Sequence, residues 1–137
     1  MPEVDDAKLE EMLGAARAIL PRAYAPYSGF HVGAALLIED DSIRTAVNVE
    51  NASYPLSVCA ERNAVASMVA SGGEKILAVA VVTNAKTPTP PCGGCRQVLW
   101  EFGNAETPVV AEGADGVRVR WRLGDLLPDA FGPDDLR

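Results

Sequence analysis

Histidine and basic residues are scarce in this sequence of 137 residues. It has one histidine, His31, so any mechanism that needs a histidine base has to use that residue. Its 12 lysines and arginines are outnumbered by 19 aspartates and glutamates, which gives a net charge of −7. Binding to a nucleic-acid backbone depends on basic groups that release counterions. We therefore expect no nucleic-acid polymer among the partners of this chain.

One short segment departs from the acidic composition. Three arginines alternate with apolar residues in the segment 117–122. This period of two predicts a strand with one apolar face and one basic face. A solvated face or a contact between subunits is the ordinary explanation of such a pattern.

The sequence also lacks a long hydrophobic run. The longest candidates, residues 34–38 and 76–82, are much shorter than the roughly 18 residues of a membrane span. Near the N-terminus stand Glu3, Asp5 and Asp6, whereas a secretory signal begins with basic residues and an apolar stretch. We expect a cytoplasmic protein that does not bind a membrane. With 48% hydrophobic residues, the chain suits a single domain over residues 1–137.

Hydrophobic periodicity and turn residues predict an alternation of helices and strands. Asp5 or Asp6 is expected to cap a first helix that reaches Leu20. We expect further helices at residues 58–71 and 93–102, a helical turn at 125–127, and strands at 30–39, 43–49, 76–83, 108–112 and 117–122. This order predicts an α/β fold in which one mixed sheet carries helices on its faces.

Three cysteines, an odd number, point to chemistry other than disulfide pairing. Cys59 starts one predicted helix region, and Cys92 and Cys95 start another. The positive end of a helix dipole and free backbone N–H groups stabilise thiolates there. Three thiolates can hold zinc and leave the fourth tetrahedral position for water, as in catalytic sites. The cysteines alone leave three alternatives open: a structural site with His31 as the fourth ligand, redox chemistry, and buried thiols.

Charged residues next to the cysteines favour the catalytic alternative. Glu61 lies two residues after Cys59, where its carboxylate can accept and return the protons of a zinc-activated water. Three thiolates on a divalent ion leave a net charge of roughly −1, which an arginine that donates to the sulfurs reduces. Arg62 is our candidate for this tuning of the zinc charge, and Arg96 is a second candidate.

Several runs of residues share a family pattern. They are 24–30 (YAPYSGF) with 32–36 (VGAAL), 48–55 (NVENASYP) through 59–62 (CAER), 91–99 (PCGGCRQVL) and 126–131 (LLPDAF). Together they resemble the cytidine deaminases, from about Leu9 to about Phe131 and in the family's order. The resemblance implies a three-layer α/β/α fold with a mixed five-stranded sheet. It also implies hydrolytic deamination of cytidine and deoxycytidine in pyrimidine salvage, with one zinc ion per subunit.

The resemblance extends to the residues of the reaction centre. The zinc ligands would be Cys59, Cys92 and Cys95. Glu61 would move protons between the attacking water, the N3 atom of the base and the departing ammonia. The members with three cysteine ligands are typically homotetramers with shared active sites, so a homotetramer is implied here as well.

Residues for the nucleoside can be matched in the same way. Asn48 and Glu50 match the pair that holds the 3′-hydroxyl of the ribose, and burying such a pair is costly unless a partner satisfies it. The other residues matched to substrate binding are Phe30, which lines the nucleoside site, Ala60, Tyr54 near an interface, and Phe131, which would reach the base from an adjacent subunit.

Other functions stay open at the level of sequence. The same zinc chemistry in a different pocket would deaminate another aminopyrimidine nucleoside. Editing of DNA or RNA is disfavoured by the net charge of −7. A non-catalytic zinc module would have no need for Glu61, and a redox protein would use Cys92 and Cys95 reversibly.

Overall fold

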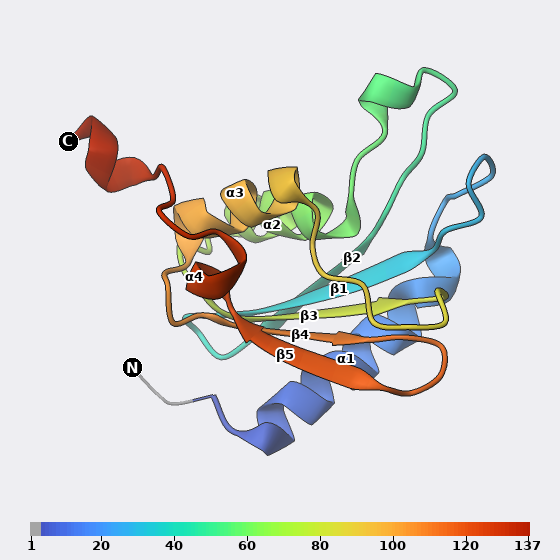
Figure 1. Ribbon diagram of the computed structural model, residues 1–137, viewed down its shortest axis with the longest axis horizontal. Helices are drawn as coiled ribbons and strands as arrows, with labels where there is room; N and C mark the ends of the chain where they lie inside the picture. The colour runs from blue at the N-terminus through green and yellow to red at the C-terminus, as the bar shows by residue number, and fades with distance from the viewer. Residues whose placement is uncertain (1–3) are drawn as a thin grey trace.

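A five-stranded sheet forms the centre of the fold. A computed structural model describes residues 4–137. Glu3, which we used to argue against a secretory signal, lies outside the described residues. Neighbouring strands are antiparallel except for β3 and β4, which are parallel, and this confirms the predicted mixed sheet. The strands, in the spatial order β2-β1-β3-β4-β5 (Figure 1), are β1 (Val32–Ile38), β2 (Ile43–Val47), β3 (Ile76–Thr83), β4 (Pro108–Glu112) and β5 (Arg118–Arg122).

Helices cover both faces of this sheet (Figure 1). α1 (Asp6–Ile19) packs on one face, α2 (Ala60–Ala70) and α3 (Gly93–Phe102) lie on the other, and the short α4 (Leu123–Leu126) follows β5. The three-layer α/β/α fold is therefore confirmed. Within residues 4–137, no helix has the length and apolar character needed to cross a membrane.

The central strands are apolar because both of their faces are covered. Every residue of β1 and β3 is buried, as expected for strands between two helical layers. Alternate side chains enter different cores: Leu36 packs on the side of α2 and α3, and Leu37 packs on the side of α1. The sheet thus separates two hydrophobic cores, and the layer of α2 and α3 is the one that contains the cysteines.

Gly33 allows α1 to approach the sheet closely. A Cβ atom at this position of β1 would lie 2.2 Å from the carbonyl oxygen of Ala16 in α1. Any side chain would force the helix and the strand apart, so glycine is required where the two backbones meet.

The first strand begins two residues later than predicted. The sequence predicts a strand from residue 30, but β1 starts at Val32. The backbone N–H of Phe30 donates to the Ser28 hydroxyl at 3.0 Å, and the N–H of His31 donates to the side chain of Asn84 at 2.9 Å. Side chains thus take the place of a neighbouring strand at the point where the chain enters the sheet.

The second helix also begins later than predicted. α2 starts at Ala60 rather than at residue 58, because Val58 forms an isolated bridge with Val49 and Cys59 is the N-cap. The same bridge explains why β2 ends at Val47, two residues before the predicted end. The other predicted helix and strand bounds differ by at most two residues, within the usual uncertainty of helix and strand ends.

The basic face predicted for residues 117–122 is neutralised within the chain. β5 lies at the edge of the sheet, and its arginines reach acidic residues of α1, of β4, of α4 and of the turn before β4. The ion pairs are Arg118 with Glu10 and Glu112, Arg120 with Asp6, and Arg122 with Glu106 and Asp125. This strand therefore offers no free positive patch for a nucleic-acid backbone.

Candidate active site

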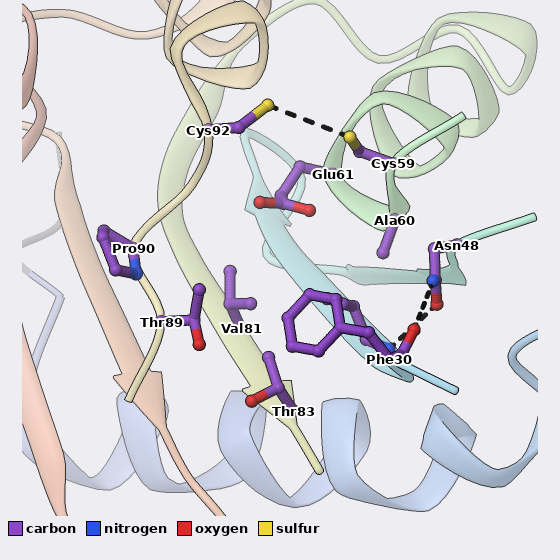
Figure 2. Close-up of a pocket in the computed structure, with 11 residues that line it drawn as sticks. Phe30, Asn48, Cys59, Ala60, Glu61, Val81, Thr83, Thr89, Pro90 and Cys92 are labelled. Carbon is purple, nitrogen blue, oxygen red and sulfur yellow. Dashed lines mark hydrogen bonds between the residues drawn. The ribbon is translucent and has the colours of Figure 1, made fainter. Parts of the chain in front are cut away.

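The N-termini of α2 and α3 bring the three cysteines together. Cys59 is the N-cap of α2, Cys92 is the N-cap of α3, and Cys95 lies in the first turn of α3. Figure 2 shows the side chains of Cys59 and Cys92 facing each other across the gap between the two helices. The first backbone N–H groups of a helix lack intrahelical acceptors and, with the helix dipole, favour negative charge. The fold therefore collects three thiols where thiolates are stabilised.

The sulfur atoms have the spacing of metal ligands. The Sγ of Cys92 lies 3.9 Å from that of Cys59 and 3.5 Å from that of Cys95, and all three lie within 4.8 Å of one another. Tetrahedral zinc with Zn–S bonds of about 2.3 Å places its sulfur ligands about 3.8 Å apart. The three thiolates fit one zinc ion. The cluster found within residues 4–137 does not include His31, which argues against a closed structural site.

The thiols differ in acidity. Hydrogen bonding with Cys95 and Cys92, together with the charge of Arg62, outweighs burial and lowers the pKa of Cys59 to about 6. The pKa of Cys95 is raised, because this thiol hydrogen-bonds to Cys59 and is buried. Cys59 therefore becomes a thiolate more readily than Cys95, and the charge of Arg62 favours that form.

The hydrogen bonds found for Arg96 go to backbone carbonyl groups rather than to the sulfurs. Its Nε donates to the carbonyl oxygen of Pro91 at 2.8 Å, and a terminal nitrogen donates to the carbonyl oxygen of Leu126 at 2.8 Å. Arg96 therefore ties the loop before Cys92 to the C-terminal segment, and the structure supports Arg62 rather than Arg96 as the arginine that acts on the thiolates.

A buried carboxylate lies beside the cysteines. Glu61 belongs to the first turn of α2 and is 5% exposed. Figure 2 shows its carboxylate between the two labelled cysteines and the strands of the sheet. Burial, with a smaller contribution from the negative charge of Cys59, raises the pKa of Glu61 to about 7. A carboxyl group that titrates near neutral pH is suited to accept a proton and to return it.

A cavity of about 140 Å³ opens next to Glu61. Six residues that the sequence singled out line it: Phe30, Asn48, Cys59, Ala60, Glu61 and Cys92 (Figure 2). The structure adds wall residues that the sequence analysis missed, namely Val32, Val81, Thr83, Thr89 and Pro90. An apolar wall with a few convergent polar groups is typical of a small-molecule site.

Asn48 is a buried amide with protein partners. Its Oδ1 accepts the backbone N–H of Val32 at 2.9 Å, and its Nδ2 donates to the carbonyl oxygen of Phe30 at 2.8 Å. These bonds fix the amide at the cavity wall and leave one N–H and one lone pair for other partners. Val32 and Phe30 therefore compensate part of the cost of burying this amide, and the remaining N–H and lone pair are available to a ligand.

Glu50 also has protein partners and lies in a neighbouring cavity. Its Oε1 accepts the backbone N–H groups of Tyr27 at 3.0 Å and Ser28 at 3.1 Å, and its Oε2 accepts the Ser28 hydroxyl. The hydroxyl of Ser28 and these N–H groups lower the pKa of Glu50. The second cavity, of about 270 Å³, is lined by Tyr27, Ser28, Glu50, Tyr54 and Ser57.

Two aromatic residues expected at the site, Tyr54 and Phe131, do not line the cavity next to Glu61. Tyr54 contacts Tyr27 edge to face, with ring centroids 5.9 Å apart. Phe131 is 59% exposed and lines neither of these cavities, and its carbonyl oxygen accepts the side chain of Gln97 at 2.7 Å. Within its own subunit, Phe131 is therefore not part of the cavity that contains Glu61.

Comparisons with known proteins agree with this arrangement. A family model described as the cytidine and deoxycytidylate deaminase zinc-binding region matches residues 6–111. The chain belongs to this deaminase family. For a zinc-binding deaminase, the cluster of Cys59, Cys92 and Cys95 supplies one zinc site per chain.

Individual relatives within the deaminase family match nearly the whole chain. A cytidine deaminase of Mycobacterium tuberculosis is 48% identical over 136 residues, which cover 99% of this chain and 96% of that protein. A cytidine deaminase of Halalkalibacterium halodurans is 46% identical over 114 residues, 83% of this chain and 86% of that protein. The crystal structure of cytidine deaminase from Burkholderia pseudomallei matches with a TM-score of 0.85 at 46% identity, over 89% of this chain and 98% of that one.

Proposed function

We propose that this chain hydrolyses cytidine and deoxycytidine to uridine and deoxyuridine, with release of ammonia. The observation that carries the proposal is Glu61, a buried carboxyl group with a pKa of about 7 beside three converging cysteines. The high identity to cytidine deaminases supports the same conclusion. We further propose that residues 1–137 act as one deaminase domain.

The proton transfers of this reaction fall to Glu61. Cys59, Cys92 and Cys95 would hold the zinc ion, which when bound lowers the pKa of water to about 7 and so supplies the nucleophile. Glu61 takes a proton from the attacking water and delivers it to N3 of the base as C4 is attacked. Glu61 then moves the proton of the new C4 hydroxyl to the amino group, so that the C4 carbonyl forms, the C4–N bond breaks and ammonia leaves. Arg62 favours the thiolate form of Cys59 through its positive charge.

Groups from both cavities bind the nucleoside. Asn48 uses its remaining amide N–H, and Glu50 uses a remaining lone pair, to hold the 3′-hydroxyl of the ribose. Phe30 forms part of the wall against the nucleoside. Ala60 is the first residue of α2, so its backbone N–H has no intrahelical acceptor and is available to the base.

The charges around the two cavities favour a nucleoside over a nucleotide. The residues that line them include neither lysine nor arginine, and their carboxylates are Glu50 and Glu61. A 5′-phosphate would meet negative charge without a basic partner. We therefore propose cytidine and deoxycytidine as substrates, although the matching family also covers deoxycytidylate deaminases.

An ultraviolet assay of purified protein tests the reaction. We expect cytidine to be converted to uridine, the activity to disappear after zinc is removed with a chelator, and the activity to return when zinc is added back. Deoxycytidylate serves as the matched substrate and should be turned over at least roughly tenfold more slowly than deoxycytidine, because its phosphate finds no basic partner. A protein that holds one zinc per chain and leaves cytidine unchanged would contradict the proposal.

We also propose a cytoplasmic homotetramer that acts in pyrimidine salvage and shares its active sites between subunits. Tyr54, Leu56 and Phe131 are large apolar side chains that are more than half exposed, which favours a contact between subunits. Light scattering should give the mass of four chains. Phe131→Ala should raise KM for cytidine, whereas Leu136→Ala, a change at another exposed apolar residue near the C-terminus, should leave KM unchanged.

A further inference from the structure

The hydroxyl of Ser28 links Phe30 and Glu50, two of the residues proposed to contact the nucleoside. The Oγ of Ser28 accepts the backbone N–H of Phe30 at 3.0 Å and donates to Oε2 of Glu50. A hydroxyl has one proton, so the Phe30 N–H on one of its lone pairs leaves that proton for Glu50. Gly29 lies between Ser28 and Phe30 in the chain and has a φ of +70°, a conformation that residues with side chains rarely adopt. The local turn therefore fixes the direction in which Ser28 donates.

These contacts leave little acceptor capacity on Glu50. An ionised carboxylate has about four lone-pair sites. The two backbone N–H groups of Tyr27 and Ser28 occupy Oε1, and the Ser28 hydroxyl occupies one site of Oε2. The remaining site is on Oε2, so the oxygen that Ser28 holds is also the one left for an external donor.

The same network reaches Asn48 through the backbone of Phe30. The N–H of Phe30 donates to Ser28, and its carbonyl oxygen accepts Nδ2 of Asn48 at 2.8 Å. Asn48 and Glu50 are thus connected through one residue whose ring lines the cavity. Removal of the Ser28 hydroxyl would release the connection on the Glu50 side and leave the Asn48 side intact.

We propose that Ser28 is a positioning residue that holds the Glu50 carboxylate in the orientation that accepts the 3′-hydroxyl of the nucleoside. This inference rests on the proposed function and adds a determinant of ribose recognition. Ser28 would act through Glu50 and would not itself touch the substrate.

The test compares Ser28→Ala with the wild-type protein on cytidine and on 3′-deoxycytidine, which lacks the hydroxyl in question. For cytidine we expect kcat/KM to fall about tenfold or more, mainly through KM, because a hydrogen bond to a charged group is lost. For 3′-deoxycytidine we expect a change of less than about threefold, because the bond that Ser28 supports is not made. Ser28→Thr keeps a hydroxyl and should recover most of the loss.

Ser42→Ala provides the matched control. The hydroxyl of Ser42 also donates to a carboxylate, that of Asp40, in the turn between β1 and β2. This contact is remote from both cavities, so we expect unchanged kinetics with either substrate. An equal loss with cytidine and 3′-deoxycytidine in Ser28→Ala would overturn the proposal, because it would show a general structural role.

A second measurement separates this inference from the proposed function. Carbon-13 NMR titration of the Glu50 carboxyl group needs no substrate, and Ser28→Ala should raise the pKa of Glu50 toward its ordinary value. An unchanged pKa would overturn the role of Ser28 even in an active enzyme. Failure of the wild-type protein to deaminate cytidine would instead refute the proposed function, and the titration would still decide whether Ser28 holds Glu50.

Discussion

Two carboxylates on opposite faces of the sheet have almost the same small exposed fraction, and their pKa values shift in opposite directions. Glu61 on the side of α2 is 5% exposed, and Glu112 on the side of α1 is 6% exposed. Glu112 accepts hydrogen bonds from Arg17 at 2.6 Å and from Arg118 at 2.9 Å. In the part of the chain that the structure describes, no hydrogen bond from another residue to the Glu61 carboxylate is found.

The difference lies in what opposes the cost of burial. Burial disfavours the charged form of both groups. At Glu112, the hydrogen bonds and charges of Arg17 and Arg118 outweigh burial and lower the pKa. At Glu61, burial prevails and raises the pKa to about 7. A buried carboxylate with its partners supplied stabilises the fold, whereas one without them is available for proton transfer.

The largest expected effect comes from Glu61→Gln. Glutamine keeps the shape of the side chain but cannot accept the proton of water, so we expect kcat to fall by roughly 10²–10⁴-fold. The zinc content should stay at the wild-type level, because the three cysteines are unchanged. The ultraviolet assay and metal analysis of the same sample check this prediction. Near-normal turnover with bound zinc would show that Glu61 is not the proton carrier.

Glu112→Gln should have the reverse profile, with lower stability and normal activity. We expect the free energy of unfolding at pH 7 to fall by about 1–3 kcal/mol, since two arginines lose a charged partner but stay partly solvated. The pKa of Glu112 is lower in the folded protein than in the unfolded chain. The carboxylate therefore stabilises the fold fully above the unfolded pKa of about 4.3, and this stabilisation is lost as the pH falls through the folded pKa. Urea unfolding of both proteins at several pH values should show the difference shrinking in acid.

A smaller loss of stability is expected at the outer end of the same network of ion pairs. Glu10 pairs with Arg118, but both side chains are substantially exposed. Glu10→Gln should therefore lower the free energy of unfolding by much less than Glu112→Gln, and added salt should reduce the effect further. A loss as large as that of Glu112→Gln would mean that burial does not decide the strength of these pairs.

Short-range patterns made much of this molecule predictable. The cysteines and Glu61 lie at predicted helix starts, and two helix N-termini that pack together bring their caps together. The strands β1 and β3 were predicted from their continuous apolar sequence, which buried central strands require. The predicted starts of β1 and α2 were wrong by two residues, because side-chain hydrogen bonds and an isolated bridge replace regular pairing there.

Contacts between distant segments were not predictable in the same way. Val81 and Thr83 were recognised as strand residues, but their place in the cavity wall depends on which face of β3 meets α2. That choice follows from strand register, which a single buried run does not reveal. The hydrogen bond of Ser28 to Glu50 joins two loops 22 residues apart, and no local pattern indicates it.

The position of the cysteines has a consequence for folding. Cys59 and Cys92 are 33 residues apart in the chain, with α2 and β3 between them. An ion held by both would tie these two segments together in the folded chain, and its binding free energy would stabilise the fold, because such a site rarely exists in an unfolded chain. Metal binding thus acts as a cross-link on the α2 and α3 side of the sheet. Within residues 4–137, the side of α1 has no such cluster of metal ligands, and it depends on its packing and on the ion pairs of Glu112.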